Sequence, residues 1–229
     1  MAGLRERKKQ QTRDALLLAA HQLFVDQGYD ATTVDTIADR VEVSQRTFFR
    51  YFASKEEVAF HFQDLMDDRF VASVTSRPHD EPPPEVLRAA FQETCAAAAE
   101  TLGEVLPLRL YLRMWRTIEV TPSLLAVHLR RQSALEDRLC TEIARRTDTD
   151  PDLDPRPHVL VAAFCGVLRA AARRWSNSAE EVSLESARDV LDSYVTHLPA
   201  VLPDGWGRAP RDGAPHAPQP RAPRLAADA

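Results

Sequence analysis

The chain has 229 residues, of which 44% are hydrophobic and 28% charged, and a formal net charge of −5. This composition is typical of a globular protein of one or two domains and excludes a fibrous or fully disordered chain. The first 13 residues are polar and basic, so we expect no secretory signal, and no apolar run approaches the roughly 20 residues of a membrane span. Together with an odd number of widely spaced cysteines, this predicts a cytoplasmic protein with reduced thiols.

Positive charge is concentrated at the N-terminal end of the chain. Residues 1–55 hold nine basic and seven acidic side chains, a net charge of +2, which leaves −7 for the rest. The segment from Leu4 to Arg13 is strongly basic, and we expect an arm that contacts DNA phosphates or enters a minor groove. A solvated charged end is the alternative, but the position directly before the helices described next favours DNA.

Three helices are predicted in the first 51 residues, and the second and third of them are short. The first runs from about Gln11 to Gln27 and ends at Gly28, which can adopt a left-handed conformation. The second carries an apolar stripe with i, i+3, i+4, i+7 spacing over residues 34–41 and is capped by Thr32 or Thr33. Ser44 is a preferred N-cap, so a third helix is expected from about Gln45 to Tyr51.

The third helix has the residue types that read a major groove. Phe48 and Phe52 are expected to face inward, which leaves Gln45, Arg46, Thr47 and Arg50 on the outer side. Glutamine can bind an adenine edge in two places, and arginine can do so with guanine. Two helices joined by a short turn, with polar residues at the start of the second, predict a helix-turn-helix. A tight three-helix corner in another all-helical protein is the alternative.

The run Thr33, Ile37, Ala38, Val43, Ser44, Thr47, Phe48, Phe52 and Lys55 resembles the TetR family of bacterial transcriptional regulators. The resemblance covers roughly the first quarter of the chain in residue type and spacing. With the residue chemistry above, it implies DNA contacts from Arg13, Thr33, Val34, Ser44, Gln45, Arg46, Thr47, Phe49, Arg50, Tyr51 and Lys55.

This chain departs from the family pattern at three positions. Family members commonly have Gly in the turn where Glu42 stands, and a positive φ there would cost a non-Gly residue about 1 kcal/mol. Phe49 lacks the hydroxyl of a family tyrosine that touches phosphate. Tyr51 replaces the usual His and keeps a polar tip.

The rest of the chain is predicted to be helical, which makes the fold class all-α with about nine helices. Ser54 caps a fourth helix that runs to about Ser73 and forms the direct covalent route from the helix-turn-helix to the body. Five more are expected at about 84–102, 106–119, 122–146, 157–175 and 184–198. We expect a DNA-binding domain at 1–55, a ligand-binding and dimerisation domain at 56–202, and a disordered Pro-rich tail at 203–229.

Apolar residues between the fourth and eighth helices are candidates for a ligand cavity, with ordinary core packing as the alternative for each. They are Phe62, Met66, Phe91, Cys95, Tyr111, Trp115, Ile118, Val127 and Phe164. The stretch from Pro122 to Trp175 is similar to a TetR branch thought to bind acyl-CoA-like ligands. That similarity implies a long apolar effector.

The last two helices are predicted to form a homodimer interface. Small residues on the eighth helix allow close approach of another helix, and an apolar stripe follows on the ninth. In the TetR family the equivalent helices pair with their copies as a four-helix bundle, which implies interface positions at Ala162, Ala163, Gly166, Ala170, Leu184, Leu191 and Tyr194. Packing within one subunit is the alternative.

No catalytic or metal-binding pattern is recognisable. The seven histidines are isolated from one another and from cysteine pairs, and no glycine-rich phosphate loop occurs. Carboxylates such as Asp67 with Asp68 are interpreted as solvated faces or helix caps. We therefore expect no enzyme, no cofactor and no metal, but a homodimeric repressor on a palindromic operator in double-stranded DNA, released by a small apolar ligand. The alternative is a ligand-binding or scaffold protein with a vestigial helix-turn-helix.

Overall fold

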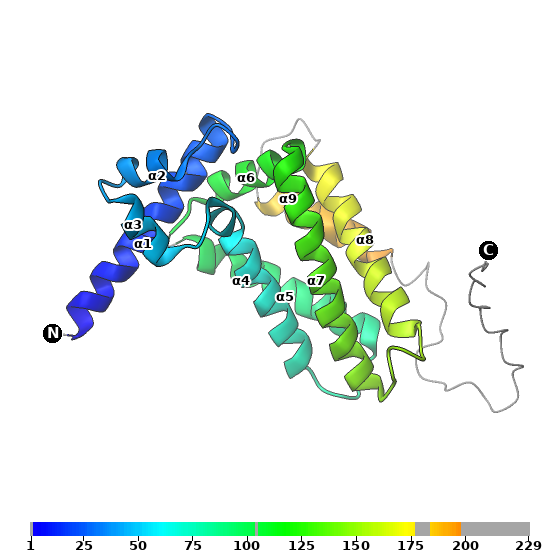
Figure 1. Ribbon diagram of the computed structural model, residues 1–229. Helices are drawn as coiled ribbons and strands as arrows, with labels where there is room; N and C mark the ends of the chain where they lie inside the picture. The colour runs from blue at the N-terminus through cyan, green and yellow to red at the C-terminus, as the bar shows by residue number, and fades with distance from the viewer. Residues whose placement is uncertain (1, 104, 177–183, 198–229) are drawn as a thin grey trace, which may run out of the picture.

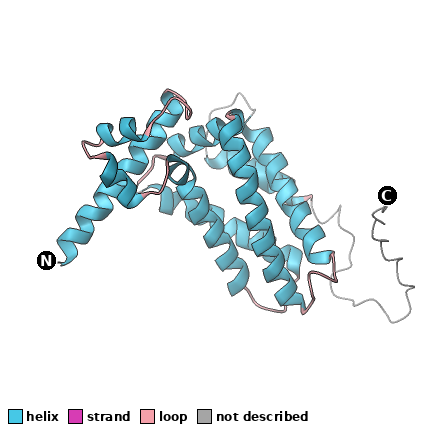
Figure 2. Cartoon of the chain, in the orientation of Figure 1, coloured by secondary structure: helices cyan, strands magenta, loops and turns pink. Residues whose placement is uncertain are grey.

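A computed structural model describes residues 2–103, 105–176 and 184–197, and every regular element in these ranges is an α-helix (Figure 2). The predicted all-α class is confirmed. The helices are α1 (Ala2–Asp26), α2 (Val34–Arg40), α3 (Gln45–Tyr51), α4 (Lys55–Ser76), α5 (Pro83–Gly103), α6 (Leu108–Val120), α7 (Pro122–Thr147), α8 (Arg156–Ser176) and α9 (Leu184–Thr196). None of these helices is long and apolar enough to cross a membrane.

The prediction of a basic arm before the first helix is wrong in one respect, because the residues of the arm belong to that helix. α1 begins at Ala2, well before the predicted start near Gln11. The segment after Gly3 contains Arg, Lys, Glu and Gln, which are good helix formers, and no further Gly or Pro. Side-chain pairs support it: Lys9 Nζ lies 3.4 Å from Glu6, and Gln10 donates to Asp14 at 2.8 Å.

Three hydroxyl caps begin the short helices and the helix that follows them. Thr33, Ser44 and Ser54 each accept a hydrogen bond from the backbone N–H three residues ahead, at 3.1 Å in every case. Thr33, not Thr32, therefore caps α2, and α3 has the predicted bounds. The turn between them places Glu42 at φ 55°, the left-handed conformation that the family pattern of Gly predicts at this position.

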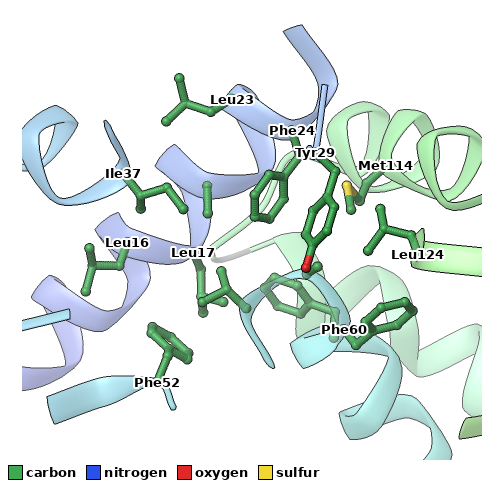
Figure 3. Packing of buried hydrophobic residues seen from close by; sticks show 14 of the residues in the cluster. Leu16, Leu17, Leu23, Phe24, Tyr29, Ile37, Phe52, Phe60, Met114 and Leu124 are labelled. Atoms are coloured by element: carbon green, nitrogen blue, oxygen red, sulfur yellow. The ribbon is translucent and has the colours of Figure 1, made fainter. Parts of the chain in front are cut away.

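The N-terminal helices share one hydrophobic cluster with α4, α6 and α7. In Figure 3, Phe24 and Tyr29 lie beside Met114 of α6 and near Leu124 of α7. The cluster also includes Phe48, with no solvent exposure. The predicted domain boundary at residue 55 divides the sequence, but this hydrophobic cluster contains residues from both sides of it. α6 therefore provides a second, non-covalent connection between the N-terminal helices and the body.

A second hydrophobic cluster lies between the C-terminal half of α4 and helices α5, α7, α8 and α9. Figure 1 shows α1 to α3 grouped on one side of the molecule, with α4 leading from them into this bundle. Buried members include Phe70, Leu87, Leu139 and Phe164. The Pro-rich tail expected at 203–229 lies outside the described residues.

The C-terminal end of α4 is held by a buried arginine of α7. Arg146 donates to the backbone carbonyls of Val74, Arg77 and Pro78, with 2.9 Å to Arg77 and 3.3 Å to Val74. The Val74 and Arg77 carbonyls are among those that the end of a helix leaves without a helical partner. The end of α4 is therefore fixed to α7, while its other end carries the helix-turn-helix.

Candidate DNA-binding surface and ligand cavity

The first turn of α3 presents its polar side chains to solvent. Gln45, Arg46 and Arg50 are exposed and Thr47 is half-buried, while Phe48 between them is fully buried. The Ser44 hydroxyl oxygen caps the helix and lies 3.0 Å from the Thr47 hydroxyl. The buried Phe48 fixes the rotation of the helix, so the polar residues face outward together.

The end of α3 carries a second group of candidate contacts. The Arg50 guanidinium carbon lies 5.1 Å from the centre of the Tyr51 ring, and its Nη2 is 3.5 Å from the Tyr51 hydroxyl. Phe49 is 50% exposed, so a hydrophobic surface stands where the family has a phosphate-contacting tyrosine. Across the turn, Thr33 is exposed and Val34 is half-buried.

Lys55 has an internal role that the sequence did not reveal. Its Nζ donates at 2.9 Å to the carbonyls of both Tyr29 and Thr32 and lies 4.1 Å from the centre of the Tyr29 ring. Burial, with smaller effects of Glu56 and Asp30, raises the pKa of Tyr29 to about 12. Lys55 thus holds the α1–α2 connection, and its phosphate contact stays a prediction for the remaining N–H.

Arg13 is also partly engaged inside the protein. Its guanidinium carbon lies 5.4 Å from the centre of the Phe52 ring, and Nη2 is 3.4 Å from Nδ1 of His61 on α4. Burial and then the charge of Arg13 lower the pKa of His61. Arg13 therefore joins α1 to the α3–α4 junction, and its contact to DNA remains a prediction.

A cavity of about 260 Å³ lies within the bundle of the body. Five of the nine residues expected at a ligand site line it: Met66, Phe91, Cys95, Tyr111 and Trp115. The structure places the other four elsewhere: Phe62, Ile118 and Val127 are buried in the first cluster and Phe164 in the second. These helices carry apolar residues on more than one side, so the sequence pattern does not separate a cavity wall from a core.

Polar side chains at the cavity were missed by the sequence analysis. Gln63 lies 3.0 Å from Nδ1 of His128, and Arg169 donates to Gln132 at 3.2 Å and to Glu136 at 3.1 Å. In the part of the chain that the structure describes, the additional lining residues are Gln63, Asp67, Phe70, Thr94, Ala98, Leu112, Gln132, Leu135, Cys165, Leu168, Arg169, Ala172, Trp175 and Leu191. The lining is therefore mainly apolar, with a few polar groups from several helices.

Asp67 does not lie on a solvated face, which corrects the expectation for it. It lines the cavity, and burial, followed by the nearby charge of Asp64, raises its pKa to about 7. Its helical neighbours have partners on α7, since Asp64 pairs with Arg131 and Asp68 pairs with Arg138 at 2.8 Å. The i, i+3 and i+4 spacing of these three carboxylates shows that they share one face of the helix, but it does not show which of them faces the cavity.

The expected dimer residues fall into separate environments. Ala162, Ala170 and Tyr194 are exposed, and a methyl group added at Gly166 would meet no atom closer than Nη2 of Arg169, at 3.9 Å. Ala163 packs against the second cluster, and Leu191 lines the cavity. Leu184 begins α9, but its side chain is outside the described residues.

α3 is capped by Ser44 and exposes a polar face, and the helical body attached to it contains a cavity. These features define a helix-turn-helix transcriptional regulator. Residues 16–61 match the family described as bacterial regulatory proteins, tetR family, and residues 81–203 match the MftR C-terminal domain. The chain is 43% identical to the HTH-type transcriptional regulator TcmR of Streptomyces glaucescens, over 90% of this chain and 91% of TcmR. The chain belongs to the TetR family.

Solved structures share the fold. A transcriptional regulator of the TerR/AcrR family from Aquifex aeolicus superposes with a TM-score of 0.53 at 18% identity, covering 83% of this chain and 99% of the other. NalD of Pseudomonas aeruginosa, a repressor of a multidrug efflux pump, gives a TM-score of 0.52 at 15% identity, covering 83% and 96%. At these identities the likeness concerns the fold alone.

Proposed function

We propose that the chain is a homodimeric, sequence-specific repressor that a small apolar ligand releases from a palindromic operator. The observation that carries the proposal is the path of α4. This helix begins with Lys55 beside the helix-turn-helix and contributes Met66, Asp67 and Phe70 to the cavity. At 1.5 Å per residue, Lys55 and Asp67 are roughly 18 Å apart along it.

A ligand in the cavity contacts the same helix that holds the DNA-binding unit. If the ligand binds better to one position of α4, it shifts the protein toward that position, and the coupling is reciprocal, so DNA must weaken ligand binding equally. Arg13, which lies against Phe52 and beside His61, links α1 to the start of the same helix. The proposed release is therefore a change in half-site geometry.

Small residues on α8 that are exposed or half-buried support the proposed dimer. Ala162, Gly166 and Ala170 follow one another at four-residue spacing on one face, and Val159 of the same helix is 57% exposed. A two-fold axis would place two α3 helices in successive major grooves, about 34 to 36 Å apart, which explains a palindromic operator.

The proposed effector is small and mostly apolar, as the lining residues are. Among them Arg169 is the basic side chain, and it is held by Gln132 and Glu136, so the cavity suits the acyl part of an acyl-CoA-like ligand better than its phosphates. The proposed regulator carries out no catalytic step and acts in the cytoplasm.

The test begins with genomic DNA fragments retained by the purified protein, which are sequenced to find the operator. We expect a palindrome, binding that falls steeply with salt, and a dimer by sedimentation. Gel shifts with the wild type and the Gln45→Ala variant then test base recognition. Equal affinity for operator and random duplex, with no salt dependence, would instead favour a scaffold protein with a vestigial helix-turn-helix.

A further inference from the structure

The cavity combines aromatic walls with one carboxyl group that has no partner. Rings of Phe70, Phe91, Tyr111, Trp115 and Trp175 line it. Among the described residues, Asp67 makes no hydrogen bond and no ion pair. Since a carboxyl group in an apolar site loses hydration without compensation, this arrangement is costly unless a ligand supplies the partner.

Polar and charged groups near Asp67 on α4, α5, α7 and α8 already have partners. Arg131 and Arg138 of α7 are paired with Asp64 and Asp68, the neighbours of Asp67 on α4. Gln63 contacts His128, Thr94 donates to the Ala90 carbonyl at 2.8 Å, and Arg169 is paired with Glu136. The partner that Asp67 lacks must therefore come from outside these groups.

The electrostatic surroundings of Asp67 favour a cation. Two negative charges, Asp64 and Asp68, and two positive charges, Arg131 and Arg138, act on it, so an ionised Asp67 leaves this group with a net negative charge. The Tyr111 hydroxyl of α6 and the Cys165 thiol of α8 also face it, and burial raises the pKa of Tyr111 and raises that of Cys165 to about 12. Both are neutral near pH 7, so they add no charge.

We propose that the cavity, as the effector site of the proposed regulator, recognises a lipophilic cation whose ammonium group binds the Asp67 carboxylate and whose apolar body lies among the aromatic rings. Ring faces attract ammonium ions, and an ion pair restores the interactions that Asp67 loses on burial. An anionic ligand of the same shape is rejected, because it would place a second negative charge beside Asp67.

Three probes with one skeleton test the charge requirement: adamantylamine, adamantanol and adamantane carboxylate. Their compact hydrocarbon cage suits a cavity of about 260 Å³. Binding to the full-length, DNA-free protein is measured by calorimetry. We expect the amine to bind about tenfold to a hundredfold more tightly than the alcohol, as for a hydrogen bond to a charged group, and the carboxylate to bind least.

Two matched variants test the residue. Asp67→Asn should reduce the advantage of the amine over the alcohol to about twofold or less. Asp68→Asn removes the same charge from an exposed neighbour and should leave most of that advantage. If Asp67→Asn fails to fold, the wild-type pH profile replaces it: amine binding should strengthen from about pH 5 to pH 8 as Asp67 ionises, while alcohol binding does not.

The inference is overturned if the alcohol or the carboxylate binds as tightly as the amine, if none of the probes binds, or if Asp68→Asn has the larger effect. Because these measurements use no DNA, they are independent of the proposed repression. Amine binding without release of the operator would contradict the proposed function and leave the cation site intact. Release of the operator by a neutral ligand alone would support the proposed function and contradict the cation site.

Discussion

The two hydrophobic clusters found among the described residues differ in how completely their side chains fill the space between the helices. The first packs α1, α2, α3, α4, α6 and α7 together, and Phe24, Phe48 and Phe60 in it have no solvent exposure. The second lies against the cavity, where Phe91 remains partly exposed and touches the rings of Phe70 and Phe164 at centroid distances of 5.9 and 6.1 Å. Around α3 the first cluster is closed, which fixes side chains that must meet DNA in one geometry, whereas the rings around Phe91 leave a space that can admit a ligand.

Truncating an aromatic ring in each cluster should give the largest difference between them. Phe48→Ala removes a fully buried ring under α3 and should lower the free energy of unfolding by about 3 to 5 kcal/mol. Phe91→Ala, its control in the cavity wall, should cost clearly less, because that ring is incompletely packed. Urea denaturation measures both, and equal losses would show that the clusters do not differ in packing.

Acid should weaken the first cluster through a buried histidine. Burial lowers the pKa of His21 to about 4, although its Nδ1 lies 2.8 Å from the Leu17 carbonyl. The unfolded chain, with a pKa near 6.5, binds the proton more readily, so the free energy of unfolding falls as pH drops from about 6.5 to 4, by about 3 kcal/mol.

Replacing His21 by Gln removes this titration, and the pH dependence of unfolding should flatten over the same range. His128, beside the cavity, also has its pKa lowered to about 4, by burial and then Arg169, so part of the slope should persist. The His128→Gln variant measures that part separately. Urea titrations at several pH values give the slope, and an unchanged slope in His21→Gln would show that His21 does not cause it.

Substitution on the outer face of α3 should affect recognition without affecting the core beneath it. Arg46→Ala and Gln45→Ala should each lower discrimination between the operator and mutated sites by about 1 to 3 kcal/mol, because each would remove a proposed contact to a base edge. Both residues are exposed, so the free energy of unfolding should change little. Competition gel shifts measure the preference, and an unaltered preference would reject the base contacts.

The smallest expected effect concerns the turn between α2 and α3. Glu42 has φ 55°, which glycine adopts without steric cost, so Glu42→Gly should raise the free energy of unfolding by up to about 1 kcal/mol. Asp39→Gly, within α2, serves as the opposite control and should destabilise the protein. Loss of stability in Glu42→Gly would mean that the greater freedom of glycine in the unfolded chain dominates.

Local chemistry made the helix-turn-helix predictable. Ser44 as a cap, Phe48 as the buried residue and Glu42 in the turn each have a cause within a few neighbouring residues. The cavity depends instead on contacts between distant helices. Asp67 is next to Asp68 in sequence, yet one lines the cavity and the other pairs with Arg138, and that difference depends on where α7 packs.

The same dependence on contacts between distant segments explains why the contacts of Lys55 and Leu191 differ from those predicted. Lys55 was expected only as a DNA contact, but its partners are carbonyls 23 and 26 residues away in the chain. Leu191 has the spacing of an interface stripe, and the packing of α9 against α8 brings it to the cavity instead. Helical periodicity indicates which side of a helix is apolar, but not what that side will meet.

The carbonyls that Arg146 holds fix one end of α4 to α7. Val74 and Arg77 are anchored to α7, whereas Met66 lies about 15 Å from Ser76 along the helix axis and Lys55 about 32 Å from it. When a rigid helix tilts about one fixed end, each point on it moves in proportion to its distance from that end. If α4 tilted as a rigid body about this end, a displacement at Met66 would be roughly doubled at Lys55.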